Sequence, residues 1–194
     1  MRLLTLICTT WLVGCSGAPE PAEPAEVTAL EALPGDSLYH LDTPLIDQHG
    51  DAVPLSVFAG QPVLISMFYA SCPSACPMLI SDIKSLEEAL TDAERANLRV
   101  LLVSLDPVAD TPAQLASVID QHGLDTDRWR LTAPAPEHVR DIAAVLGISY
   151  QAIDGGELHH SSIITLLDSR GTPVIRLEGL RQSPEPLLAA LRGL

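Results

Sequence analysis

The sequence predicts an α/β fold in which a mixed β-sheet is flanked by helices. Two nearly continuous apolar runs, residues 63–69 and 99–105, are typical of central strands that are buried on both faces. A helical pattern follows each run, and this order predicts a parallel βαβ core. Two short apolar segments near the C-terminus, separated by the turn residues 168–171, add an antiparallel pair to the sheet.

The first elements of the domain are a hairpin, a strand and a helix. The hairpin is expected over residues 45–55, with its turn near Gly50. The helix after strand 63–69 is indicated by apolar residues at steps of three and four, which form one face of a helix. These residues are Leu79, Ile83, Leu86 and Leu90.

Capping signals delimit the helix that follows strand 99–105. Thr111 is the expected N-cap and Pro112 the first helical residue. Gln114 completes the spacing of a capping box, and Gly123 ends the helix. The remaining elements are a helix over 136–146 ended by Gly147, strands over 162–167 and 173–177, and a closing helix over 184–191.

The order of these elements limits the possible folds and partners. Periodicity alone specifies an α/β sandwich, and a mixed sheet with helices on both faces is what a thioredoxin-like fold requires. We therefore expect a thioredoxin-like domain with an N-terminal hairpin over residues 33–194. A hydrophobic fraction of 47% excludes global disorder. The formal charge of −14, without a basic cluster, argues against nucleic acid as a partner.

The N-terminal 32 residues are expected to target and anchor the protein. Residues 1–14 combine Arg2 with a short apolar run, which indicates a secretion signal. The ending Leu12-Val13-Gly14-Cys15 resembles a bacterial lipobox, so we expect a lipoprotein signal peptide and acylation of Cys15. Ordinary cleavage, with Cys15 left free or removed, is the alternative. The Pro-, Ala- and Glu-rich residues 15–32 predict an extended tether that holds an exported domain at a membrane of the cell envelope, facing the periplasm.

Loss of Cys8 with the signal and acylation of Cys15 leave Cys72 and Cys76 as the thiols of the domain. They lie where a buried strand meets a helix, and positions i and i+4 of a helix share one face. A helix N-terminus lowers the pKa of a thiol, and Pro73 stiffens the loop. Preorganised thiolates suit soft Cu(I), although such a pair also fits redox exchange or a structural disulfide.

A third ligand is expected from the adjacent residues His159 and His160, which lie in a predicted loop over residues 158–161 just before the strand over 162–167. If that strand is central, these residues lie at one edge of the sheet, where an imidazole can close a Cys2His site. Either histidine fits this role, and such a site suits both Cu(I) and Cu(II). The remaining histidines are expected to face solvent: His40, His49, His122 and His138.

The combined motifs resemble the Sco/SenC family, the copper-binding proteins that assist assembly of cytochrome c oxidase. Four segments carry the resemblance, in the order and spacing of the family. They are residues 67–77 (MFYASCPSACP), 104–112 (SLDPVADTP), 129–132 (WRLT) and 160–171, which begins with His160. The resemblance covers roughly residues 33–180, and the Cys-Pro-x-x-Cys-Pro and Asp-Pro-x-x-Asp-Thr-Pro patterns are its most specific parts.

The resemblance implies that Cys72, Cys76 and His160 bind copper. The spacing from His160 to Gly171 fits the family. The family often has an acidic residue directly before this histidine, whereas this sequence has His159 there, and His159 stays an alternative ligand. The implied role is a metallochaperone for the CuA site. Its partner would be the CuA-bearing subunit of cytochrome c oxidase, or another copper or thiol protein.

Two other functions stay open at this point. The resemblance also fits a thiol-disulfide oxidoreductase in which Cys72 attacks a partner disulfide and Cys76 resolves it, so enzymatic activity is an open question. The third function is an exported, metal-free binding domain with a structural disulfide. Asp106 and Asp110 are expected to serve as turn and helix-entry residues rather than as metal ligands.

Overall fold

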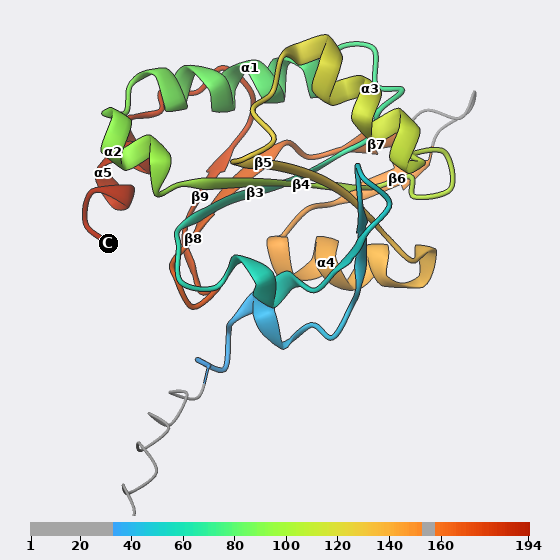
Figure 1. The fold of residues 1–194 in the computed structure, drawn as a ribbon, viewed down its shortest axis with the longest axis horizontal. Helices are drawn as coiled ribbons and strands as arrows, with labels where there is room; N and C mark the ends of the chain where they lie inside the picture. Colours follow the sequence, from blue (N-terminus) through green and yellow to red (C-terminus); the bar gives the residue numbers. More distant parts are fainter. Residues whose placement is uncertain (1–32, 153–157) are drawn as a thin grey trace, which may run out of the picture. The chain divides into compact units, whose positions relative to one another are not determined.

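The computed structural model describes residues 33–152 and 158–194. The predicted signal peptide, the acylation site Cys15 and the tether lie outside the described residues. Within the described part, no helix is both long enough and apolar enough to cross a bilayer. The predicted thioredoxin-like arrangement, a mixed sheet with helices on both faces, is confirmed (Figure 1).

Seven strands form the main sheet, in the order β2-β1-β5-β4-β3-β8-β9. The central strands β3, β4 and β5 run parallel, whereas β1 and β8 pair antiparallel on either side of them. The predicted N-terminal hairpin, β1 and β2, is therefore part of this sheet. The strands are β1 (Leu45–Asp47), β2 (Ala52–Val53), β3 (Val63–Phe68), β4 (Arg99–Ser104), β5 (Trp129–Pro134), β8 (Ile163–Leu167) and β9 (Pro173–Glu178).

Helices cover both faces of the sheet. In Figure 1, α1 and α3 lie on one face and α4 lies on the other. The expected helix over 136–146 begins as a short 3-10 turn and continues as α4. The helices are α1 (Ala75–Glu88), α2 (Asp92–Ala96), α3 (Pro112–His122), α4 (Val139–Leu146) and α5 (Glu185–Leu191), with 3-10 turns at Leu38–His40, Leu55–Phe58 and Pro136–His138.

Capping residues act largely as predicted. Gly123 and Gly147 end α3 and α4 with φ angles of 58° and 73°, in the left-handed region that favours glycine. Thr111 caps α3 by accepting the backbone N–H of Gln114. A complete, reciprocal capping box is present at the start of α2, an element not predicted from the sequence, where Thr91 pairs with Glu94.

The buried strands divide their side chains between two core clusters. Along β3, Leu64 and Phe68 belong to the cluster under α1 and α3, while Val63, Ile65 and Met67 belong to the cluster under α4. Every residue of β3 is buried. The prediction of a strand covered on both faces is therefore confirmed.

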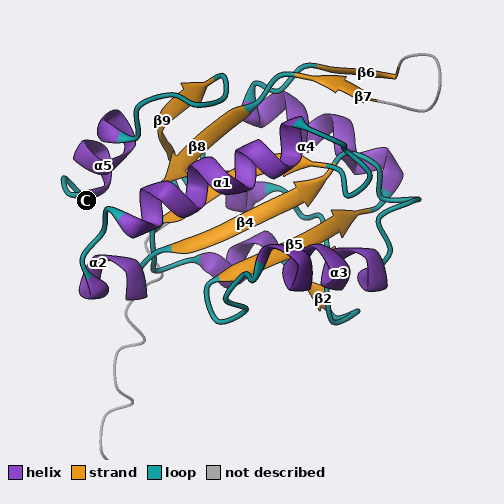
Figure 2. Ribbon diagram, turned by 90° about the horizontal axis from the view of Figure 1, so that it is seen from above, coloured by secondary structure: helices purple, strands orange, loops and turns teal. Residues whose placement is uncertain are grey.

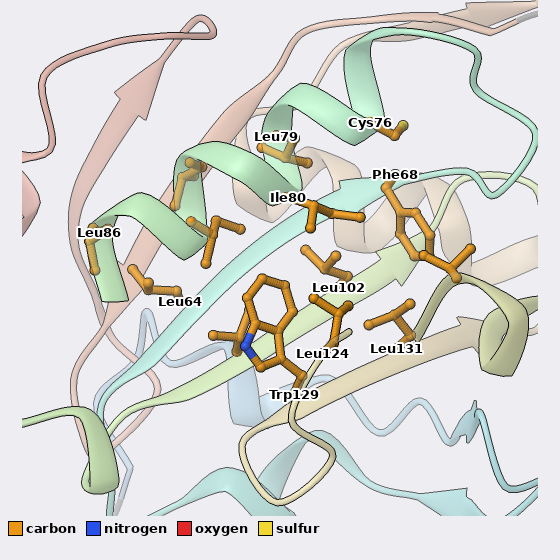
Figure 3. Packing of buried hydrophobic residues seen from close by; sticks show 14 of the residues in the cluster. Leu64, Phe68, Cys76, Leu79, Ile80, Leu86, Leu102, Leu124, Trp129 and Leu131 are labelled. Carbon is orange, nitrogen blue, oxygen red and sulfur yellow. The ribbon is translucent and has the colours of Figure 1, made fainter. Parts of the chain in front are cut away.

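Strand β5 is not among the elements predicted from the sequence. Its apolar pattern is interrupted by Arg130 and it ends at Pro134, so no continuous run marks it. In the fold, Trp129 is fully buried between the sheet and α1 (Figure 3). Its Nε1–H donates to the buried Glu87 carboxylate at 2.9 Å, and Arg128 pairs with the same carboxylate. These contacts join residues far apart in the chain, and local periodicity cannot show them.

A second sheet of two strands corrects the expectation of a loop at residues 158–161. β6 (Tyr150–Ala152) and β7 (Leu158–His160) pair antiparallel, with Tyr150 opposite His160. Strands of three residues are too short to show alternation in the sequence. Figure 2 shows this hairpin beside the end of the main sheet that also holds the start of α1.

The segment before β1 is held against the turn between β8 and β9. Leu38 N–H donates to the Gly171 carbonyl at 2.9 Å, and Ser37 Oγ donates to the Arg170 carbonyl. The Tyr39 ring packs so closely on Gly171 that a Cβ atom there would lie 2.6 Å from Tyr39 Cδ2. Gly171 also has a φ of 79°, so this position requires glycine for two independent reasons.

Replacement of Gly171 by alanine is therefore expected to destabilise the domain more than the same change at Gly50. Both glycines have positive φ, but nothing lies within 4 Å of a Cβ at Gly50. We expect Gly50→Ala to cost about 1–2 kcal/mol from backbone strain and Gly171→Ala a further ~1–3 kcal/mol from overpacking. Urea unfolding measures both values, and equal losses would contradict the packing of Tyr39.

Candidate metal centre

The two cysteines lie on either side of the start of α1. Strand β3 ends at Phe68 and α1 begins at Ala75, so Cys72 belongs to the connecting loop and Cys76 to the first helical turn. The expectation that both share one helix face is therefore wrong for Cys72. The loop instead folds back, so that Cys72 Sγ accepts the N–H of Cys76 at 3.3 Å.

A long-range strand pairing brings a histidine to this loop. Strand β8 runs antiparallel to β3, with Val63 opposite Leu167 and Ile65 opposite Thr165. The start of β8 therefore lies beside the end of β3, where the cysteine loop begins. His160, the last residue of β7, comes shortly before β8 and so reaches the same edge of the sheet.

The donor atoms of Cys72, Cys76 and His160 converge on one point. These atoms all lie within 4.8 Å of one another, and Cys76 Sγ is 4.0 Å from His160 Nε2. Both cysteines are free thiols and buried, and His160 is half-buried. Cys76 also lies at the end of the core cluster under α1, close to Phe68 (Figure 3).

Hydrogen bonding fixes the tautomer of His160, so that its unprotonated nitrogen, Nε2, faces Cys76. Its Nδ1 lies 3.1 Å from the carbonyl oxygen of Ser161, and a carbonyl can only accept, so Nδ1 carries the proton. The neutral ring then presents the lone pair of Nε2 to Cys76. The ring also makes an edge contact with Tyr69, with the ring centroids 5.8 Å apart.

The structure separates the two candidate histidines. Adjacent residues of a strand point to opposite faces, so His159 in β7 points away from His160. His159 is exposed and opposite Gln151 in the hairpin, and it is not part of the donor cluster. Of the remaining histidines, His40 and His49 are exposed as expected, while His122 and His138 are half-buried.

A sequence profile of the SCO1/SenC family matches residues 36–194. The chain belongs to the SCO1/SenC family. The SCO1 protein homolog of Bacillus subtilis (strain 168) is 26% identical over 144 residues, which are 71% of this chain and 72% of that one.

Solved structures of relatives share the fold. Bradyrhizobium japonicum ScoI with copper bound superimposes with a TM-score of 0.66 at 24% identity, over 78% of this chain and 96% of that one. BsSco is reported with a disulfide switch, as a member of the Sco family of cytochrome c oxidase assembly proteins. It superimposes with a TM-score of 0.67 at 21% identity, over 77% of this chain and 88% of that one.

The two thiols of this SCO1/SenC protein differ strongly in acidity. Burial opposes ionisation of Cys72, but N–H groups of Cys76 and Ser74 and the side chains of Cys76 and Tyr69 hydrogen-bond its sulfur, and together they lower its pKa below the usual value. Burial raises the pKa of Cys76 far above its usual value, and the neighbouring Cys72 raises it further. Cys72 is therefore the more acidic thiol of the pair.

Two other groups at the site have shifted pKa values. Burial lowers the pKa of His160 and outweighs the hydrogen bond to Ser161, so its ring stays neutral into mildly acidic solution. Burial, together with the hydrogen bond and charge of Cys72, raises the pKa of Tyr69 to about 12. Tyr69 therefore stays a neutral donor to Cys72, a role that no sequence motif indicates.

A buried carboxylate supports the cysteine loop from beneath. Asp110 is 1% exposed and accepts the Ala70 N–H at 3.1 Å and the Ser104 hydroxyl at 2.6 Å. Ala70 lies two residues before Cys72, so this bond sets the path of the loop. The expectation that Asp110 is structural is thus confirmed, and Asp106 similarly accepts the N–H of Ala109 within its own turn.

The donor set is chemically suited to copper. Two sulfurs and one imidazole bind copper more strongly than they bind hard cations such as Mg²⁺, which prefer oxygen ligands. Three ligands also leave coordination positions for an incoming donor. The half-buried His160 and the loop position of Cys72 place this donor set at the surface end of the core.

Thiol alkylation is expected to modify Cys72 before Cys76. The thiolate is the nucleophile, and iodoacetamide at neutral pH should therefore react at Cys72 at least about tenfold faster. The rate at Cys72 should fall as the pH drops through its lowered pKa. Peptide mass spectrometry of the treated protein measures both sites. In urea the two rates should become equal, and equal rates in the folded protein would contradict the difference in acidity.

Removal of the Asp110 carboxylate should destabilise the domain. Asp110→Ala leaves the buried Ala70 N–H and Ser104 hydroxyl without their acceptor, an expected loss of about 1–3 kcal/mol. Burial raises the pKa of Asp110, so the neutral Asp110→Asn should be tolerated better. The more exposed Asp106→Ala serves as control and should change stability by less than ~0.5 kcal/mol. Chemical unfolding that ranks the three variants otherwise would refute this account.

Proposed function

We propose that this protein is a copper metallochaperone that holds copper through Cys72, Cys76 and His160 and passes it to the CuA site of a cytochrome c oxidase subunit. The observation that carries the proposal is the convergence of two sulfurs and Nε2 within 4.8 Å. Strand alternation selects His160 rather than His159 as the third ligand. Copper in the solved structure of Bradyrhizobium japonicum ScoI supports the choice of metal.

The geometry suits a carrier that must both hold and release its cargo. Copper is bound here as cargo, by three protein ligands only. The lowered pKa of Cys72 and the neutral ring of His160 favour copper binding near neutral pH, because Cys72 gives up its proton more readily than an ordinary thiol and Nε2 of His160 has none to lose. Ser71 and Pro73, on either side of Cys72, are exposed, which supports contact of this loop with a recipient protein.

The proposed recipient is argued from the family, and the proposed location is argued from the N-terminal residues. BsSco is described as a member of a family of cytochrome c oxidase assembly proteins, and this supports the CuA-bearing subunit as partner. We propose further that Cys15 is acylated, that residues 15–32 tether the domain, and that the domain faces the periplasm from a membrane of the cell envelope.

A thiol-disulfide oxidoreductase is the second candidate function, and the difference in acidity between the two thiols favours it. The Cys72 thiolate would attack a partner disulfide, forming a mixed disulfide and releasing one partner thiolate. That thiolate takes the proton of Cys76, whose sulfur then attacks Cys72 and releases the second partner thiolate. The partner gains two electrons, and Cys72 and Cys76 become a disulfide.

Copper titration of single variants tests the first function. The full-length chain carries Cys8→Ser and Cys15→Ser throughout, so that Cys72 and Cys76 are its remaining thiols. Anaerobic Cu(I) titration against a chelator should show one site. His160→Ala should weaken binding by more than about 100-fold, because even loss of a group that only supports a metal ligand costs ~10–100-fold. Cys72→Ala and Cys76→Ala should act likewise.

His159→Ala is the matched control and should leave the affinity unchanged, because His159 faces away from the sulfurs. The same His160→Ala protein should still reduce a model disulfide, since exchange needs only the thiols. If His160→Ala binds copper as tightly as the parent chain, the metallochaperone proposal fails. A chain that binds no copper and exchanges no disulfide would instead be a metal-free binding domain.

A further inference from the structure

A pocket between α1 and α3 is lined by both cysteines. Cys72, Cys76, Pro77 and Ile80 line it from the loop and α1, and His122 and Val118 are among the residues that line it from α3. His160 is not part of this lining. In Figure 2, α3 and the β6–β7 hairpin, which ends in His160, lie on opposite sides of the start of α1.

The sulfurs need such an approach because they are nearly closed to solvent. Cys72 is 7% exposed and Cys76 is 3% exposed. The pocket has a volume of about 80 Å³, and a cavity needs about 10–15 Å³ by the same measure to hold one water molecule. A metal ion with one or two waters therefore fits, whereas a protein segment does not.

The chemistry of the lining is selective. Among the described residues that line the pocket there is no Asp, Glu, Lys or Arg, although the chain carries a formal charge of −14. A hard cation thus meets no carboxylate there. Besides the two sulfurs, the imidazole of His122 is the lining group with the highest affinity for copper in either oxidation state.

The position of His122 is set by the fold. It is the last residue of α3, and Gly123 ends the helix directly after it. Its carbonyl accepts a hydrogen bond of 2.8 Å from Nζ of Lys84, the only lysine of the sequence. Lys84 belongs to α1, so this bond ties the end of α3 to the helix that carries Cys76. His122 thus lines the pocket while staying half-buried.

We propose that the α1–α3 pocket is the entry site for copper and that His122 is an accessory ligand, which binds the incoming ion before it passes to Cys72 and Cys76. This inference rests on the proposed copper-binding function. Copper exchanges ligands one at a time in this sequence, without oxidation or reduction of the ion. His160 then completes the final site from the opposite side, so His122 affects the rate of loading but not the final affinity.

The test compares rates and equilibria of copper loading. The probe is Cu(I) presented anaerobically as its bicinchoninate complex, and loss of the absorbance of that complex after rapid mixing reports loading. The full-length chain with Cys8→Ser and Cys15→Ser is the parent protein. We expect His122→Leu to slow copper loading about tenfold and to leave the final copper occupancy unchanged. Tenfold is the low end of the loss in affinity or activity that follows removal of a group beside a metal site.

Two further variants test whether His122 acts as a copper ligand or only fills space beside the pocket. His122→Met keeps a soft donor and should restore most of the parent rate, whereas His122→Leu has a similar volume without a donor. His49→Ala is the control: it removes an exposed histidine at the turn after β1, whose antiparallel pairing with β5 places that turn at the opposite edge of the sheet. His49→Ala should load at the parent rate.

The possible results have distinct meanings. Equal loading rates for the parent chain and His122→Leu would overturn the entry site while leaving the proposed function intact. Slowing that His122→Met does not relieve would also overturn it, because the effect would then be structural. A parent chain that takes no copper from the complex would refute the proposed function itself, and the entry site with it.

Discussion

The antiparallel pairing of β8 with β3 is the constraint on which the candidate metal centre depends. The cysteine loop follows β3 directly, so that strand brings the sulfurs to this edge of the sheet. The imidazole comes from a residue 84 positions beyond Cys76. It arrives at the same edge because β8 runs in the opposite direction to β3 and begins where β3 ends. A parallel pairing would have placed His160 at the far edge of the sheet.

Burial and hydrogen bonding then give each donor a different character. Cys72 receives several hydrogen bonds and is the more acidic thiol, whereas Cys76, deeper in the core cluster, keeps its proton. The carbonyl of Ser161 fixes the tautomer of His160. Two thiols of unequal acidity and one neutral imidazole form a donor set that suits a soft cation. The same difference in acidity suits stepwise disulfide exchange, so both chemistries share one structural basis.

The surroundings of the sulfurs differ from the rest of this acidic chain. Among its described lining residues, the pocket between α1 and α3 has no Asp, Glu, Lys or Arg, and the carboxylate of buried Asp110 accepts hydrogen bonds from Ala70 and Ser104. An acidic surface with a neutral path to two sulfurs favours soft over hard cations at the site itself. His122 stands beside that path because Lys84 and Gly123 fix the end of α3.

The sequence by itself determined the parts of this protein that depend on local pattern. The continuous apolar run of β3, the helical spacing after it and the two cysteines between them predict a thiol pair at a strand-helix junction. The glycines at positions 123 and 147 predict helix ends for a similarly local reason. Tertiary structure decided the rest. The spacing from His160 to Gly171 favours His160 over His159, but short β7 shows no alternation of its own, so only its pairing with β6 gives the face on which each histidine lies.

Strand β5 is held by neighbours distant in sequence, through the buried Trp129 and its bond to Glu87. The support from Asp110 and the position of His122 likewise depend on contacts between elements 38 or more residues apart. Periodicity reports which face of an element is apolar. It does not report which elements meet, and the ligand set, its acidity and the route to it all arise where they meet.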